Sequence, residues 1–243
     1  MQYKTSNPVF HSYFWKNQYS VSEKMTLGGI ILKTVYTLFL VGLTTWYVWS
    51  LVKQGKSVTY YIYGGLLVAL FFSVLTSYKK RWSPVTVPIY ALAKGCFLGG
   101  ISAYAEIRFE GMPMQAVKIS IITFFVMLLL YKWQIIKVTH QFRSVIYSAI
   151  ATIMTIYIIG FILRLFDIHL GIIYGTSWFS IGFTLIAASV AAFSLLLDFY
   201  YIDKKIGKVP KYMEWVATWG ILVSLIWMYV EILRLMKKLA IKF

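Results

Sequence analysis

Residues 183–236 read FTLIAASVAAFSLLLDFYYIDKKIGKVPKYMEWVATWGILVSLIWMYVEILRLM, two long apolar segments joined by a short basic loop. Each segment is long enough to cross the hydrocarbon core of a bilayer as an α-helix, which takes about 20 residues. Asp198 lies within the first segment, Glu214 lies at the start of the second, and Glu231 lies near its far end. A carboxylate inside hydrocarbon costs about 2.5–3.5 kcal/mol on insertion scales, so these acids are candidates for function.

The composition excludes a soluble domain. Of the 243 residues, 60% are hydrophobic and only 13% are charged, and a soluble chain would need more polar surface. The apolar runs are continuous rather than alternating, which indicates helices and not the strands of a barrel. We therefore predict an all-α, polytopic membrane protein, with an N-terminal arm at residues 1–26 and one seven-helix transmembrane domain at residues 27–243. The seven predicted spans are 27–52, 58–78, 86–105, 114–133, 144–165, 176–201 and 212–236.

The net charge of +16 does not indicate a nucleic-acid partner, because the basic residues do not form one patch. They fall in short clusters between the apolar runs, as the positive-inside rule expects of cytoplasmic loops. More lysine and arginine residues lie on the side of the N-terminal arm than on the other side. The sequence therefore predicts a cytoplasmic N-terminus and an outer C-terminus, although the basic C-terminal tail argues against this orientation.

Lys33 and Lys94 are two of the lysines that lie within the predicted spans. Lys33 is close to the start of the first span, and we interpret it as a membrane anchor whose long stem reaches the headgroups. Lys94 lies near the middle of the third span, where an ammonium needs a carboxylate partner or loses its proton. Lys94 has two possible roles. It could form a structural ion pair with an acid of the last two spans, or it could take part in ion passage. Beside it, Gly95 and Gly99 form a small-xxx-small face that allows close helix packing.

The loop after the third span holds Glu106 and Glu110 on the predicted outer side. These acids could attract cations to a vestibule, or they could belong to an ordinary solvated turn. The single cysteine, Cys96, excludes an intrachain disulfide and a cysteine-based metal site. The histidines have no ligand spacing, and phosphate-binding, zinc-protease and nucleophile-elbow motifs are absent from the sequence. We expect no enzyme activity, no metal site and no cofactor.

Three stretches resemble the Bax inhibitor-1/YccA family of small seven-span membrane proteins, and in particular its bacterial branch. They are SNPVF (6–10), PIYALAKGCFLGGISAYAE (88–106) and KYMEWVATWGILVSLIWMYVEILRL (211–235). The resemblance implies a location in the inner (plasma) membrane and a fold with the last helix at the centre. It also implies a calcium leak that responds to pH through an acid pair on the sixth and seventh spans. Two close carboxylates that share a proton are a sound physical switch.

Carried onto this sequence, the resemblance places the sixth-span acid at Asp198 and leaves its partner open. Counting along the seventh span from the loop leads to Leu222 to Ser224, where no acid stands. Matching the local pattern YVEILRL gives Glu231. A hairpin that turns at Ile206 favours Glu214, because residues 198 and 214 are equally far from the turn.

The sequence therefore predicts a pH-sensitive cation leak, with calcium as the transported ion. Asp198 forms a latch with Glu214 or Glu231, Lys94 modulates the latch, and Glu106 and Glu110 collect cations outside. A lysine beside an acid pair could also replace proton sharing with a fixed salt bridge. The alternative function is a regulatory protein without flux that modulates a membrane protease such as FtsH and uses the basic N-terminal arm for this contact.

Overall fold

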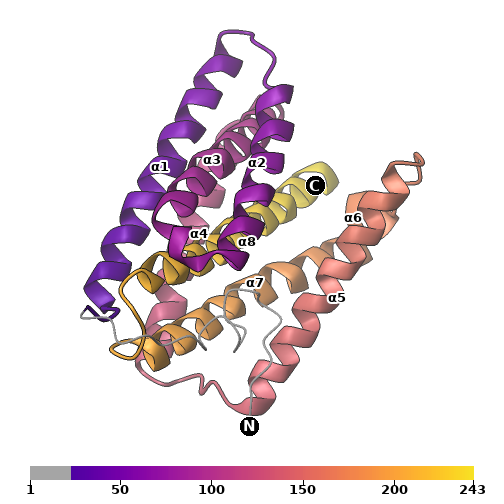
Figure 1. Ribbon diagram of the computed structural model, residues 1–243. Coiled ribbons are helices and arrows are strands. Elements are labelled where there is room, and N and C mark those ends of the chain that lie inside the picture. Colours follow the sequence, from indigo (N-terminus) through magenta and orange to yellow (C-terminus); the bar gives the residue numbers. More distant parts are fainter. Residues whose placement is uncertain (1–22) are drawn as a thin grey trace. The chain divides into compact units, whose positions relative to one another are not determined.

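The computed structural model describes residues 23–243. Most of the predicted N-terminal arm, including SNPVF (6–10), lies outside the described residues. Seven helices in the described part are long and apolar enough to span a membrane, and each corresponds to a predicted span (Figure 1). The all-α, seven-span prediction is confirmed. These helices are α1 (Leu27–Lys53), α2 (Thr59–Tyr78), α3 (Ser83–Arg108), α4 (Met112–Lys132), α5 (His140–Arg164), α7 (Trp178–Lys205) and α8 (Met213–Lys242).

The differences from the prediction lie at helix ends and in two of the connections between helices. The fifth span begins at His140 rather than 144, because Thr139 caps it by accepting a hydrogen bond from the amide of Phe142 at 3.2 Å. The last helix continues past 236 to Lys242. Two short elements were not predicted, the 3₁₀ turn η3 (Lys80–Trp82) and the helix α6 (Gly171–Tyr174). Elements this short are too brief to show hydrophobic periodicity.

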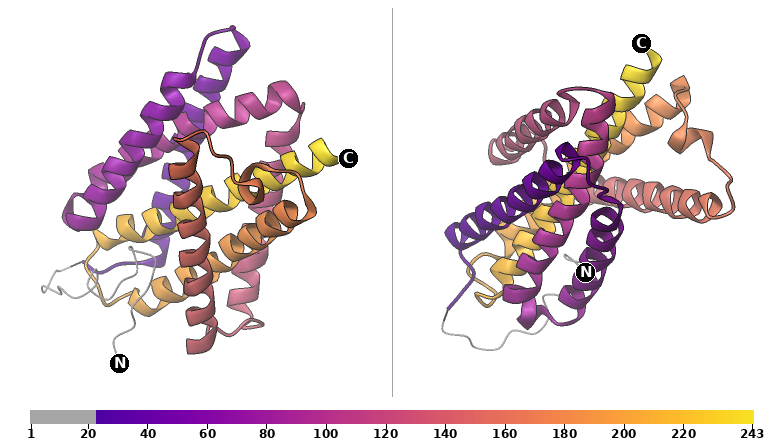
Figure 2. Two further views of the ribbon diagram at one scale, coloured as in Figure 1. Left: turned by 90° about the vertical axis from the view of Figure 1, so that its right-hand side faces the viewer. Right: turned by 90° about the horizontal axis from the view of Figure 1, so that it is seen from above.

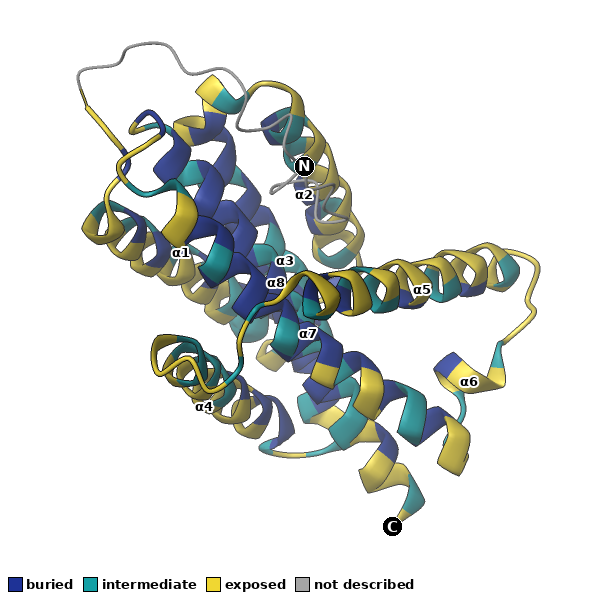
Figure 3. Cartoon of the chain, turned by 90° about the horizontal axis from the view of Figure 1, so that it is seen from below, coloured by how far each residue is buried: buried dark blue, intermediate teal, exposed yellow. Residues whose placement is uncertain are grey.

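Burial separates the helices into two groups. In the most apolar part of α8, 78% of the residues are buried, against 56% in the third span and 67% in α7. The corresponding shares for α1, α2, α4 and α5 lie between 11% and 22%. Figure 3 shows the contrast between α8, which is mostly dark blue, and α5, which is mostly yellow and teal. The last helix is thus the most buried of the seven spans, as expected for a central helix, whereas the exposed apolar side chains of the second group suit contact with lipid.

The described residues group into two compact units. One contains the described residues up to Glu110 together with Tyr201–Val223, and the other contains Gly111–Tyr200 and Ser224–Phe243. Within the first unit, α3 packs against both α1 and α2, as Figure 1 shows and Figure 2 shows from two further directions. The long helices α7 and α8 each contribute to both units. The prediction of one domain at residues 27–243 stays a prediction.

The predicted glycine face of α3 is confirmed as a close contact with α1. A Cβ on Gly99 would lie 2.8 Å from the carbonyl oxygen of Thr45 and 2.9 Å from the Cβ of Val48. A Cβ on Gly95 would collide with the side chain of Thr44. The hydroxyl of Thr45 donates to the carbonyl of Gly95 at 3.1 Å, which holds the two backbones together. Only a residue without a Cβ allows this approach.

The segment before α1 is held by the loop between α7 and α8. The amide of Met25 donates to the carbonyl of Val209 at 2.9 Å, and the amide of Gly207, at φ 71°, donates to the carbonyl of Met25 at 3.0 Å. An exposed ion pair joins Glu23 to Lys211 at 2.8 Å. The hydrogen bond to Glu23 and the negative charge of that group raise the pKa of the Lys211 amine. These contacts fix where α1 begins relative to the start of α8, both of which belong to the first unit.

The glycine contact gives the first test. We expect Gly99→Ala to lower the stability of the purified protein by about 1–3 kcal/mol, because the added methyl group meets backbone that cannot rotate away. Gly64→Ala in α2 is the control, since a Cβ there meets nothing within 4 Å and alanine favours a helix over glycine. Thermal unfolding in detergent measures both. Equal midpoints for the two variants would contradict the close contact.

Candidate functional site

Asp198 is buried within α7, with 1% of its surface exposed. Its carboxylate accepts a hydrogen bond of 2.5 Å from the hydroxyl of Ser224 on α8. Ser224 is also buried, and both residues belong to the second unit. A serine hydroxyl can donate to a carboxylate and accept from a carboxylic acid. The contact is therefore compatible with both protonation states of Asp198.

Sequence reasoning considered Glu214 and Glu231 as partners of Asp198 and missed Ser224. Counting along the seventh span from the loop leads to Leu222 to Ser224, a stretch that includes Ser224. The sequence analysis looked for an acid there, and this stretch holds none. The structure shows that the hydroxyl of Ser224, at the end of the counted stretch, donates a hydrogen bond to the Asp198 carboxylate.

Glu214 lies in the first turn of α8 and is fully buried. Its carboxylate accepts hydrogen bonds from the amide of Thr26 at 2.8 Å and from its hydroxyl at 2.9 Å, and it forms an ion pair with Lys33. Thr26 caps α1, and Lys33 lies two turns further on the same face. Gly29 is adjacent, where a Cβ would collide with the carboxylate. The negative charge thus lies at the N-terminal ends of two helices, where their dipoles favour it.

Lys33 therefore corrects the sequence interpretation. It was assigned as an anchor that reaches the headgroups, but it forms an ion pair with Glu214, and only 16% of its side chain is exposed. Its ammonium also lies 5.5 Å from the ring centroid of Trp215. A buried carboxylate without a nearby cation is costly, and this cost outweighs the hydration that the lysine ammonium loses when it forms the pair.

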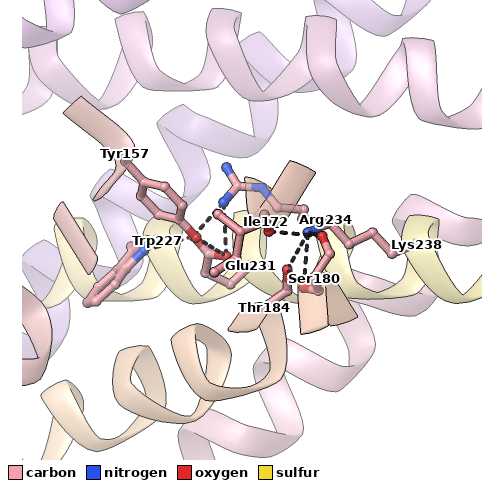
Figure 4. A network of polar contacts seen from close by, with 8 residues as sticks. All are labelled: Tyr157, Ile172, Ser180, Thr184, Trp227, Glu231, Arg234 and Lys238. Carbon is pink, nitrogen blue, oxygen red and sulfur yellow. Dashed lines mark hydrogen bonds and ion pairs between the residues drawn. The ribbon is translucent and has the colours of Figure 1, made fainter. Parts of the chain in front are cut away.

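Glu231 is fully buried in α8 and lies at the centre of the network in Figure 4. The hydroxyl of Tyr157 on α5 lies 2.9 Å from each carboxylate oxygen, and the indole nitrogen of Trp227 donates at 3.1 Å. Arg234, one turn along α8, completes an ion pair at 3.2 Å. The guanidinium of Arg234 also lies over the ring of Tyr157, 4.6 Å from its centroid. These contacts satisfy the carboxylate and tie α8 to α5 within the second unit.

The ion pair that the sequence left open for Lys94 is not formed with Glu214, which belongs to the same unit and pairs with Lys33. Pairing of Lys94 with another acid of the last two spans stays a prediction. The ammonium of Lys94 lies 5.8 Å from the ring centroid of Tyr90 and 5.4 Å from that of Phe97, which is cation–π distance. The role of Lys94 in ion passage stays a prediction.

The two acids of the predicted vestibule lie at one end of α3. Glu106 is partly buried near the end of that helix, and Glu110 is exposed in the turn that leads to α4. Their role in collecting cations stays a prediction. Within residues 23–243, no group of three or more histidine, cysteine or acidic side chains is placed to hold a metal ion.

The ion pair of Glu214 can be tested by a double-mutant cycle. We expect Lys33→Met to lower the stability by about 3–5 kcal/mol, because it leaves a buried carboxylate without its cation. Adding Glu214→Gln should recover most of that loss, since the neutral amide no longer needs a counter-charge. Thermal unfolding in detergent measures both.

Lys211→Met is the matched control, since it breaks a lysine–glutamate pair at the surface of the same unit and should change the midpoint little. Equal losses for Lys33→Met and Lys211→Met would show that the buried pair has no special role.

The comparison with known protein families agrees with the sequence and the fold. The sequence model of a family described as Bax inhibitor 1 like matches residues 7–241, which is nearly the whole chain. No curated protein and no solved structure matches the chain. The match includes the stretch at residues 211–235 on which the resemblance mainly rests, and it also includes Asp198, Lys33 and Tyr157. The chain belongs to the Bax inhibitor 1 like family of membrane proteins.

Proposed function

We propose that this multi-pass membrane protein is a passive cation leak, with calcium as the ion to test first, and that protons control it through Asp198. The observation that carries the proposal is the burial of the Asp198 carboxylate within a membrane-spanning helix, against the neutral hydroxyl of Ser224. Ionisable groups at such depth are expensive and are commonly part of ion or proton pathways. Protonation of Asp198 removes a negative charge that a passing cation would otherwise meet.

The other acids of the last two spans have a different part in this proposal. Glu214 and Glu231 are each held by a basic residue and by further donors, which gives a structural reason for their burial. We assign a structural part to the two glutamates. We assign the proton response to Asp198, because the hydroxyl of Ser224 can serve both protonation states of that residue. Lys94 modulates the passage from within the third span, and Glu106 and Glu110 concentrate cations at the outer end.

Calcium flux into liposomes tests the proposal. We expect the reconstituted protein to admit calcium at a rate that changes with pH, and we expect Asp198→Asn to remove this pH dependence because asparagine does not titrate. Asp167→Asn is the matched control and should behave like the wild type. Asp167 is an exposed acid with φ 58°, a backbone conformation that asparagine tolerates.

Two outcomes would contradict the proposal. One is a pH-dependent flux that Asp198→Asn leaves unchanged, which would move the proton response to another group. The other is an absence of flux at every pH from protein that is folded in the liposomes. That result would favour the alternative, a regulatory protein that modulates a membrane protease such as FtsH.

We also propose that the protein lies in the inner membrane with its N-terminus in the cytoplasm. The connection between α7 and α8 and the adjoining helix end carry Lys204, Lys205, Lys208 and Lys211, as the positive-inside rule expects of a cytoplasmic loop. In a bacterial host, alkaline phosphatase fused after Phe243 should be active, and green fluorescent protein at the same position should be dark. The same reporters inserted after Gly207 should give the opposite pattern. Fluorescence from the C-terminal fusion would reverse the orientation.

A further inference from the structure

Lys238 on α8 is a buried lysine whose ammonium is surrounded by neutral oxygens. Only 5% of the surface of Lys238 is exposed. The Nζ atom donates to the hydroxyl of Ser180 at 2.7 Å, to the hydroxyl of Thr184 at 2.7 Å and to the carbonyl of Ser180 at 3.2 Å (Figure 4). An ammonium has three protons, and these three contacts use all of them. Lys238 takes part in none of the ion pairs of the described residues.

The two hydroxyls present lone pairs, not protons, to the lysine. Ser180 Oγ lies 2.7 Å from the carbonyl oxygen of Gly175 and 2.9 Å from that of Ile172, and it donates its proton to these carbonyls. Thr184 Oγ1 donates to the carbonyl of Ser180 at 2.9 Å. Carbonyl oxygens cannot donate, so the hydroxyl protons point toward them. The oxygens that face Lys238 are all acceptors.

This polarity excludes a serine–lysine catalytic pair. In such a pair the lysine is a neutral amine that accepts the serine proton, and the serine oxygen is open to a substrate. Here Ser180 is fully buried, its proton is directed to backbone carbonyls, and the lysine donates. The arrangement is suited to hold a cation.

Hydroxyl and carbonyl oxygens are the ligands that proteins use for hard cations, and in many transporters the backbone beside a broken helix supplies them. The same local structure is present here. The short helix α6 ends at Tyr174, the chain is extended at Gly175, and α7 begins at Trp178. Ser180 and Thr184 follow one turn apart on the same face of α7. The positive end of the α7 dipole disfavours a cation at this place, so the oxygens must offset it.

We propose that the oxygen cluster of Ser180 and Thr184 is a site for a small monovalent cation, and that the ammonium of Lys238 is its built-in occupant. The lysine is a tethered ion that holds the end of α8 to the start of α7 within the second unit. Arg234, one turn earlier on α8, cannot take this part because it forms the ion pair with Glu231. Removal of the lysine head group should leave a vacant site that free sodium, potassium or ammonium ions can fill.

Ion-dependent stability of the purified full-length protein tests this proposal independently of any flux. Thermal unfolding of the wild type and of Lys238→Ala is measured in the chlorides of sodium, potassium, ammonium and N-methylglucamine at equal ionic strength. The wild type should unfold at the same temperature in all four salts. Lys238→Ala should be least stable in N-methylglucamine, which is too large to enter. Its midpoint should rise by about 3–5 °C for each tenfold increase of a small cation above its Kd.

Two further variants make the result specific. Lys237→Ala removes an exposed lysine from the same helix turn and should show no preference among the salts. Lys238→Ala combined with Thr184→Val removes one oxygen ligand at nearly constant shape and should abolish the ion dependence. A midpoint of Lys238→Ala that is the same in all four salts would overturn the proposal.

Lys238→Met covers the case in which the alanine variant does not fold, because methionine fills the space of the apolar stem. Recovery of either variant only when small cations are present would support the site. Failure of both to fold in every salt would overturn it, since an added ion should refill a true cation site.

Discussion

A charged side chain in a membrane-spanning helix must find its partners inside the protein, because lipid offers none. This constraint acts most strongly on α8, the most buried span, which carries buried charges at Glu214, Glu231 and Lys238. Each is met by a different helix: α1 through Lys33 and Thr26, α5 through Tyr157, and α7 through Ser180 and Thr184. Within each unit, polar contacts thus hold the part of α8 that belongs to it, in addition to packing.

The free energies involved explain why a few polar contacts contribute so much to the stability of the fold. Helices in lipid gain little from burying apolar surface against one another, since lipid tails are equally apolar. Removing one partner of a buried ion pair costs about 3–5 kcal/mol, which is a large part of the 5–15 kcal/mol that typically separates folded from unfolded protein. The close approach of α1 and α3 at Gly95 and Gly99 adds van der Waals contact to this framework.

The contact between Asp198 and Ser224 differs in its chemistry from the ion pairs of the two glutamates. Glu214 and Glu231 meet lysine or arginine, which favour a fixed negative charge. Asp198 meets Ser224, whose hydroxyl can serve a carboxylate or a carboxylic acid. The resemblance to the family implied two carboxylates sharing a proton, and here a hydroxyl stands at the counted position. In the function proposed above, the proton response therefore rests on Asp198, with the hydroxyl of Ser224 as its contact on α8.

The sequence by itself determined the seven spans and identified the last two as the carriers of the candidate acids, because hydropathy over about 20 residues is a local property. It also predicted the contact face at Gly95 and Gly99, since small residues four apart lie on one side of a helix. Only the tertiary structure decided that Lys33 pairs with Glu214, that Ser224 faces Asp198, and that Lys238 lies among the oxygens of Ser180 and Thr184. Those pairings join residues far apart in the chain. They depend on the rotation and register of each helix against its neighbours, which the hydropathy of a single segment leaves undetermined.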